Sequence, residues 1–505
     1  RTWPWLLALA RLTPVFLLGV ILWMIWQRTP QVPVWDEWEM TELVQKLAAG
    51  RLTVSDLWAF HVHNEHRIVV SRLSSLVFIE LTGWNRQVQM TFNAGVVAIT
   101  VAFLLDCARS AVANRDLSAA MLLPFSLLLF SLARFSSWFQ PVTDKIPTAF
   151  GVALCMWALA RAPVSTPRFA LAITGAVIAS LSSLGGMLVW AAFAPAVWLT
   201  GRMRFLVWLA AALAIVVPYL VGFPTGTLTP DYTRETVQRL PPVEALRYGL
   251  TLLGASVGYP WVNLALAFGL LSVALLGANV AALWWSPRRE EVLSVRPSSR
   301  VIPTKEESRR RRRAVLWTPK WFLEALAPLG MTRLSHRAGA PIRRPIPQTA
   351  AAWGGLALFA LGSAGAVAVG RGAGFGIESA IGSRFHTFSS LWWCVVFVVA
   401  AATSLRLVTT PAGAHGRQSV AIRALLAANV VVLALALAGV VQANVAGFLQ
   451  TSAGQDRLRQ NQGCVLAYAE ADEACLALYH WDPALTRSRA AWLDARDLAI
   501  FGRKP

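Results

Sequence analysis

Residues 5–26 read WLLALARLTPVFLLGVILWMIW. At about 1.5 Å of rise per residue, a helix of this length matches the roughly 30 Å hydrocarbon core of a bilayer. Hydrocarbon offers the backbone no hydrogen-bond partners, so a segment that crosses it must be a helix or part of a closed barrel. Barrel strands need only about ten residues and alternate in polarity, which this run does not do. The stretch therefore predicts a membrane-spanning helix.

The same pattern recurs along the 505-residue chain, which is 56% hydrophobic and 14% charged, whereas soluble domains carry about 25% charged residues. We expect an all-α, polytopic membrane bundle of about eleven transmembrane helices. The apolar run 68–81 contains Arg72 and Glu80, and we expect it to lie on the membrane surface. The other ten predicted spans are roughly 87–105, 117–134, 146–161, 168–183, 185–200, 204–223, 261–285, 350–370, 388–407 and 421–443.

Half of the net charge of +20 falls in residues 286–349, which hold 15 Lys/Arg against 5 Asp/Glu. Most of the remaining excess is Arg between spans, which does not indicate nucleic-acid binding. Cytoplasmic loops are enriched in Lys and Arg, so we place 286–349 in the cytoplasm. We interpret this segment as a solvated, disordered linker, with a contact to anionic membrane lipids as the alternative.

This orientation divides the chain into four parts: an N-terminal transmembrane module 1–285, the linker 286–349, C-terminal helices 350–443 and an extracytoplasmic tail 444–505. The module includes the external loop 27–86. We expect the tail to pack on the external loops. Because the first span is long enough to remain as an anchor, we expect no cleaved signal peptide, although the chain begins with Arg and its true N-terminus stays open.

The cysteines suggest one disulfide at most. Cys464 and Cys475 both lie in the tail and can bond if the tail is extracytoplasmic. Cys107, Cys155 and Cys394 lie in or beside apolar runs, where we expect inert packing residues.

Asp36 and Glu37 are the strongest candidates for chemistry, because they follow the first span by about ten residues, between Trp35 and Trp38. A carboxylate at the membrane surface can take a proton from an attacking hydroxyl or hold a divalent metal beside a phosphate. Alternatively, Asp36 caps a helix, with Glu39 three residues later completing a capping box. The two interpretations are compatible.

A second polar group in the same loop is Asn64, Glu65, His66 and Arg67, which we expect to contact substrate. Together with His61 and His63 it could also supply metal ligands, but no known zinc spacing matches, and metal dependence stays open. On the same external face as this loop, Gln140 follows the third span, and we expect it to contact substrate as well. Arg384 precedes a late span, where its planar fork can bind a phosphate or snorkel to the interface.

These features resemble the GT-C superfamily of integral-membrane glycosyltransferases, whose first external loop carries a functional Asp or Glu and amphipathic helices. The matching residues are Trp35–Trp38 and the stretch through Arg67. The resemblance implies a polyprenyl-phosphate-linked sugar donor, Asp36 or Glu37 as base or metal ligand, and Arg384 at the donor phosphate. The Asp-x-Asp pattern of the metal-using oligosaccharyl branch is absent.

The chain also resembles a set of bacterial membrane proteins of unassigned function, through Asn64–Arg67, Phe139–Gln140 and Ser383–Phe385. The GT-C resemblance implies an enzyme whose active site faces outside the cytoplasm, and the second resemblance implies a protein of the bacterial inner membrane. We expect it to transfer a sugar to a lipid, glycan or protein acceptor. The alternatives are a lipid or glycan transporter or flippase, disfavoured by the few intramembrane charges, and a non-catalytic assembly subunit.

Overall fold

The computed structural model describes residues 4–60, 67–112, 114–222, 241–285, 347–409 and 419–502, and in these ranges the regular structure is entirely helical. The chain divides into one unit formed by Arg1–Ala281 with Pro345–Pro505 and a second unit, Ala282–Arg344. The predicted linker lies almost wholly outside the described residues, so its disorder stays a prediction. The cavities and hydrogen bonds described for this protein lie in the first unit.

Among the described residues, eight helices are long and apolar enough to cross a membrane, and each overlaps a predicted span. The chain is therefore a helical membrane protein, as expected. The eight candidate spans are Pro4–Arg28 (α1), Arg86–Ala111 (α5), Arg115–Phe139, Arg202–Leu220 (α13), Val262–Leu283 within α16 (Val262–Trp285), Gln348–Arg371 within α19 (Pro347–Phe375), Ser383–Thr409 with α20 (His386–Thr409), and Val420–Leu466 with α21 (Ser419–Gln460). The span Arg115–Phe139 comprises α6 (Arg115–Ala120), α7 (Leu122–Leu129), η2 (Leu132–Arg134) and α8 (Phe135–Phe139).

The other three predicted spans correspond to shorter apolar helices. They are α9 (Lys145–Leu159), α10 (Thr166–Ser182) and the broken segment Leu184–Trp198, formed by η3 (Leu184–Met187), α11 (Leu188–Ala192) and α12 (Ala194–Trp198). A helix of about 15 residues reaches only about 22 Å, short of a full crossing. The count of eleven spans therefore stays a prediction.

Residues 224–260 lie between the predicted spans 204–223 and 261–285, and part of this segment is a buried helix. Residues 223–240 lie outside the described part of the chain, but Pro242–Gly258 forms the 17-residue helix α15. From Thr251 to Gly258 this helix is buried, and Ser256 donates a hydrogen bond to the carbonyl of His386. A Cβ on Gly254 would meet the carbonyl oxygen of Ala265 at 1.8 Å, so only glycine allows α15 and α16 to approach this closely. This buried helix contains polar and small residues, which lower its mean hydropathy, so hydropathy alone did not identify it.

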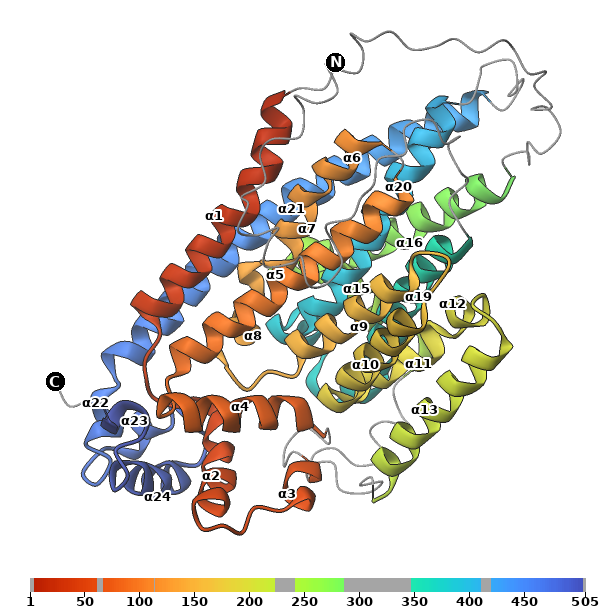
Figure 1. Ribbon diagram of the computed structural model, residues 1–505. Helices are drawn as coiled ribbons and strands as arrows, with labels where there is room; N and C mark the ends of the chain where they lie inside the picture. The colour runs from red at the N-terminus through yellow and green to blue at the C-terminus, as the bar shows by residue number, and fades with distance from the viewer. Residues whose placement is uncertain are drawn as a thin grey trace, which may run out of the picture. The chain divides into compact units, whose positions relative to one another are not determined.

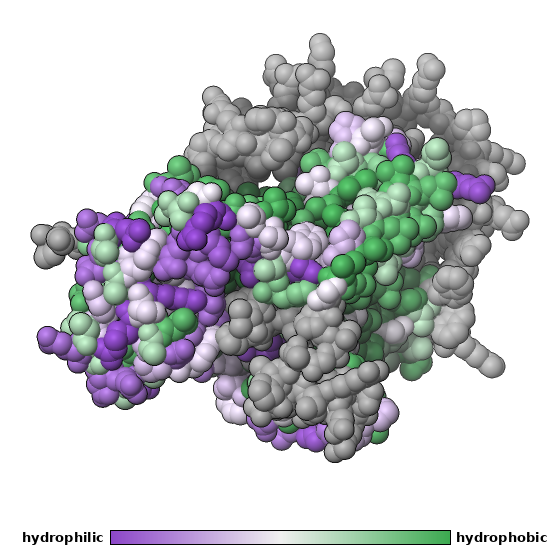
Figure 2. All heavy atoms as spheres, turned by 90° about the horizontal axis from the view of Figure 1, so that it is seen from below, coloured by the Kyte–Doolittle hydropathy of each residue, from purple (hydrophilic) through white to green (hydrophobic). Residues whose placement is uncertain are grey.

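One end of the unit gathers the short helices of the first loop and the tail (Figure 1). These are η1 (Trp35–Glu39), α2 (Met40–Ala48), α3 (Val54–Trp58) and α4 (Val69–Thr82) with α22 (Gly463–Leu466), α23 (Glu473–Leu476), α24 (Pro483–Asp494) and η9 (Ala499–Gly502). We call this end the loop end. Seen from below, hydrophilic side chains gather on one part of the surface and hydrophobic side chains on another (Figure 2).

The first loop and the tail share one hydrophobic core at the loop end. Trp38 and Val44 of the loop are buried in it together with Leu476, Tyr479 and Phe501 of the tail. Helix α21 continues to Gln460, about 17 residues beyond the predicted span end at 443, so its last turns form the first part of the tail. The tail therefore packs on the first loop, as expected.

The cysteines also match the expectation. A disulfide joins Cys464 and Cys475 within the tail. The other three cysteines, Cys107, Cys155 and Cys394, are unpaired and buried.

Candidate functional site

The acidic segment of the first loop folds as the 3-10 helix η1, which begins with a left-handed residue. Trp35 has φ +53°, a conformation that costs a bulky side chain roughly 1–3 kcal/mol. Its N–H donates to the carbonyl oxygen of Tyr479 at 2.6 Å, so the tail holds the residue that precedes Asp36. The N-cap of the following helix α2 is Glu39, whose side chain makes no capping bond. Asp36 lies inside η1, whose N-cap is Val34, so Asp36 is not a helix cap.

Asp36, Gln140 and Arg384 line the same cavity, although 348 positions separate the first from the last. The cavity has a volume of about 50 Å³, which is room for a few water molecules at roughly 10–15 Å³ each. Of the predicted site residues in the described part of the chain, these three are the ones that come together.

Hydrogen bonds between elements bring the three residues together. Ser383, beside Arg384, donates through its hydroxyl to Ser136 Oγ of α8 at 2.6 Å. The loop that starts at Gln140 is held from two helices: Asn93 of α5 donates to the carbonyl of Pro141 at 3.2 Å, and Ser71 of α4 donates to the carbonyl of Thr143 at 2.7 Å.

Three cationic side chains line this cavity: Lys145, Arg371 and Arg384. The guanidinium carbons of both arginines lie 5.6 Å from the centroid of the Phe385 ring, so the ring holds two positive charges near each other. Lys145 is buried and forms an ion pair with Asp144, which also lines the cavity. Asp36 and Asp144 also line the cavity, so its three cations exceed the lining carboxylates by one, and this excess favours an anionic ligand.

Sequence reasoning did not single out Arg371 or Ser137. Arg371 ends an apolar span, where an arginine ordinarily marks the interface. Ser137 lines the cavity with only 1% of its surface exposed, and its hydroxyl has no hydrogen-bond partner within the described part of the protein. A buried hydroxyl without a partner is costly, so it indicates a place for a polar ligand or water. No sequence signal distinguishes this serine from its neighbour Ser136.

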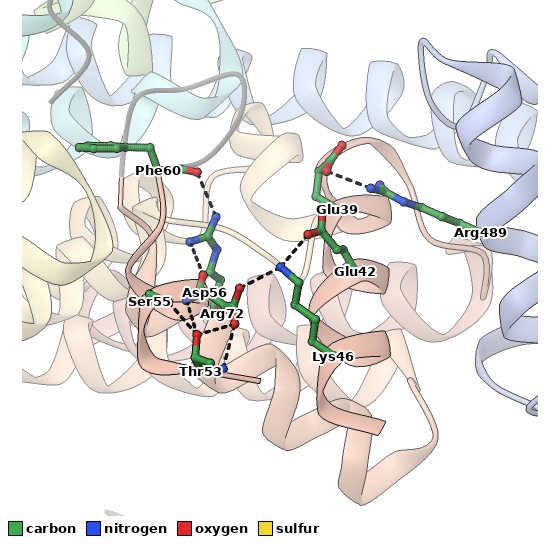
Figure 3. Close-up of polar contacts among 9 residues, drawn as sticks. All are labelled: Glu39, Glu42, Lys46, Thr53, Ser55, Asp56, Phe60, Arg72 and Arg489. Atoms are coloured by element: carbon green, nitrogen blue, oxygen red, sulfur yellow. Dashed lines mark hydrogen bonds and ion pairs between the residues drawn. The ribbon is translucent and has the colours of Figure 1, made fainter. Parts of the chain in front are cut away.

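A second cavity, of about 160 Å³, adjoins the first. Asp36, Ile68 and Val142 line both cavities, so Asp36 lies where the two meet. In the second cavity carboxylates outnumber cationic side chains, because several carboxylates and only two cations line it (Figure 3). Its charged lining residues besides Asp36 are Glu39, Glu42, Lys46, Asp56 and Arg72.

The carboxylates of the second cavity are largely engaged by protein partners. Lys46 Nζ lies 2.8 Å from carboxylate oxygens of both Glu42 and Asp56 (Figure 3). The bonds from Lys46 and then from Thr53 lower the pKa of Asp56, and Asp56 in turn raises the pKa of Lys46. This network braces α2 against α3.

Arg67, predicted to contact substrate, has a structural position. Its side-chain donors bind the carbonyl oxygens of Trp58, Tyr219 and Val221, and its guanidinium lies 3.7 Å from the ring centroid of Phe60. It lines neither of the two cavities. Backbone carbonyls accept from these donors, so Arg67 fastens the first loop to the end of α13, and its predicted contact with substrate stays a prediction. Asn64, Glu65 and His66 lie outside the described residues, so their predicted roles stay predictions.

Arg72 braces the same stretch of the first loop from α4. It donates to the carbonyl oxygens of Leu57 at 3.1 Å and Phe60 at 3.4 Å, among others (Figure 3). Two buried arginines therefore fix the backbone of residues 56–60, which forms one wall of the second cavity.

Glu37 lies in a different environment from its neighbour Asp36. It is 1% exposed, and both its oxygens accept from Arg86 of α5, at 2.6 and 2.7 Å. Burial raises the pKa of Glu37 to about 7, while the charge and hydrogen bonds of Arg86 pull it down. Glu37 lines neither of the two cavities, so of the two predicted catalytic carboxylates Asp36 is the one that lines them.

A metal site finds no support among the described side chains, which include no group of three or more His, Cys, Asp or Glu able to hold an ion. His61, His63, Glu65 and His66 lie outside those residues. Metal dependence therefore stays open.

The fold and the site together define a class: a helical membrane protein with a cavity at one end of its bundle that is lined by three cations and by the carboxylates of Asp36 and Asp144. Comparisons of the chain with protein-family models, with curated proteins and with solved structures find no match.

Proposed function

We propose that this protein is a membrane glycosyltransferase that moves a sugar from a polyprenyl-phosphate-linked donor to a lipid, glycan or protein acceptor on the extracytoplasmic face. The observation that supports this proposal is the meeting of Asp36 with Arg371, Arg384 and Lys145 at one cavity. A base beside a cluster of cations is what such a transfer needs, since a proton must leave the acceptor while a phosphate takes up negative charge.

The chemistry follows from the two kinds of lining group. The Asp36 carboxylate takes the proton of an acceptor hydroxyl as its oxygen attacks the anomeric carbon of the donor sugar. The bond from that carbon to the phosphate oxygen breaks, and the oxygen keeps the electron pair. Arg371, Arg384 and Lys145 stabilise the released polyprenyl phosphate. A single displacement of this kind inverts the configuration at the anomeric carbon.

The position of the cavity also suits a lipid-linked donor. It is lined from η6 (Ser383–Phe385), the start of α9 and the end of the span Gln348–Arg371, so its lining residues lie where apolar helices end. A polyprenyl chain can remain among the helices while its phosphate reaches the cations. The Ser137 hydroxyl supplies a neutral hydrogen-bonding group at the same wall.

The test is sugar transfer in membranes containing the protein, measured with a panel of radiolabelled polyprenyl-phosphate hexoses and pentoses. We expect Asp36→Asn to abolish the transfer seen with the wild-type chain. Glu470→Gln, which removes an exposed tail carboxylate, is the matched control and should retain activity. Undiminished transfer by Asp36→Asn would refute the role of Asp36. Movement of the intact lipid-linked sugar across the membrane, without transfer, would instead support a flippase.

A further inference from the structure

The segment that carries Asp36 is held from three sides, and two of the three anchors come from the tail. Before Asp36, the N–H of Trp35 donates to the carbonyl of Tyr479 at 2.6 Å. After it, Glu37 is fixed by Arg86 of α5. At the end of η1, Arg489 of α24 binds the chain again.

Arg489 makes two bonds to the end of η1. Its Nη1 donates to the carbonyl oxygen of Trp38 at 2.7 Å, and its Nη2 donates to the Glu39 carboxylate at 3.3 Å (Figure 3). The buried ring of His480 lies 3.6 Å from the same carboxylate. The tail therefore contacts the residue before Asp36 and the two residues that end the same helix.

The left-handed conformation of Trp35 explains why these contacts matter for the position of Asp36. A bulky residue at φ +53° relaxes toward ordinary backbone conformations unless its surroundings hold it. Because Asp36 is the next residue, relaxation at Trp35 would redirect its carboxylate away from the junction of the two cavities. The tail itself is a stiff support, since a disulfide joins Cys464 to Cys475 and Tyr479 is fully buried in the core shared with the loop.

We infer that the C-terminal tail positions Asp36, and that Arg489 is the positioning residue through which α24 sets the orientation of η1. This inference deepens the proposed function and rests on it wherever catalysis is the readout. The inference adds a requirement to the proposed chemistry. Tyr479 and Arg489 of the tail, more than 440 residues after Asp36 in the chain, are required for the placement of the base.

The test compares Arg489→Met with Arg487→Met in the purified full-length protein. Arg487 lies two residues away on α24 and donates to carbonyl oxygens of Ala469 and Ala471, within the tail itself. It therefore controls for general loosening of the tail. Hydrogen exchange of the amides in residues 34–40 is the first readout, because it reports the hold on η1 without requiring any substrate.

We expect Arg489→Met to speed exchange of these amides about tenfold, while Arg487→Met leaves them within about twofold of the wild type. Arg489→Lys, which keeps one donor for the Trp38 carbonyl, should restore part of the protection. Unchanged exchange in Arg489→Met would overturn the inference, as would equal acceleration in Arg487→Met. If Arg489→Met does not fold, Glu39→Gln removes the same ion pair and takes its place.

The second readout is sugar transfer from the labelled donor panel. We expect Arg489→Met to lower kcat at least about tenfold with donor KM within about twofold, because misplacing a base affects the transition state more than donor binding. Faster exchange with unchanged kcat would overturn the positioning role. If the wild-type chain transfers no sugar, the proposed function fails, and the exchange comparison still decides whether the tail holds η1.

Discussion

Asp36 and Glu37 are adjacent in the chain but lie in two different regions of the molecule. Asp36 lines both cavities at the loop end, whereas Glu37 is buried among protein groups and paired with Arg86. Successive residues of a 3-10 helix point about a third of a turn apart, which is enough to separate a cavity from a core. The difference teaches that the two carboxylates of an acidic pair near a membrane span can have different roles. One faces a cavity, and the other anchors the helix that carries both residues.

The largest effect should come from breaking the buried anchor. Arg86→Met leaves Glu37 as a buried carboxyl without its ionic partner, which typically costs about 3–5 kcal/mol of folding free energy. Thermal unfolding in detergent measures it. Glu37→Gln with Arg86→Met removes both charges and should recover much of the loss. Equal destabilisation by the single and double variants would mean that Arg86 acts through its other bonds, to the carbonyls of Pro30 and Phe139.

The same variant should also show a stronger pH dependence of stability than the wild type. Burial already holds the pKa of Glu37 near 7, above its ordinary value of 4.5, and loss of Arg86 removes the main opposing influence. The folded state then retains a proton that the unfolded state has released, so stability falls as pH rises from about 5 through the folded-state pKa. We expect the deficit of Arg86→Met to be larger at pH 8 than at pH 5. A deficit independent of pH would show that Glu37 does not change its protonation in this range.

Breaking the other side of the comparison should affect activity and not folding. Asp36→Asn should lower sugar transfer by about 10²–10⁴-fold, the usual contribution of a general base, with an unfolding temperature close to that of the wild type. Glu37→Gln should retain transfer in whatever fraction remains folded. If Glu37→Gln abolished transfer without loss of stability, the assignment of the two carboxylates would have to be exchanged.

A smaller effect is expected at the cationic side of the cavity. Arg384→Gln removes one charged donor near the phosphate, and hydrogen bonds to charged groups contribute about 1.5–3 kcal/mol, or roughly 10–100-fold. We expect the loss mainly in donor KM, measured with saturating acceptor. Arg423→Gln, which removes an exposed arginine near the start of α21, is the control. A loss confined to kcat would indicate that Arg384 acts in the transition state alone.

The sequence predicted the helical membrane class because apolar length is a local property that lipid makes decisive. It also placed Asp36, Gln140 and Arg384 on one face, since topology alone brings segments to the same side. It could not separate Asp36 from Glu37, because the separation depends on Arg86, a partner 49 positions away. Nor did it show that Arg67 binds backbone carbonyls, a fact that requires the position of the end of α13.

The smallest effect should come from an exposed ion pair, which sharpens the contrast with the buried one. Glu42 lies one turn before Lys46 on α2, and its side chain is 55% exposed. Water screens such a pair, so Glu42→Gln should change stability by less than about 0.5 kcal/mol. Lys46 retains its bond to Asp56, which keeps α2 braced against α3. Unfolding in detergent at low and high salt measures the change. A loss approaching that of Arg86→Met would mean that the brace, and not the buried pair, holds the first loop in place.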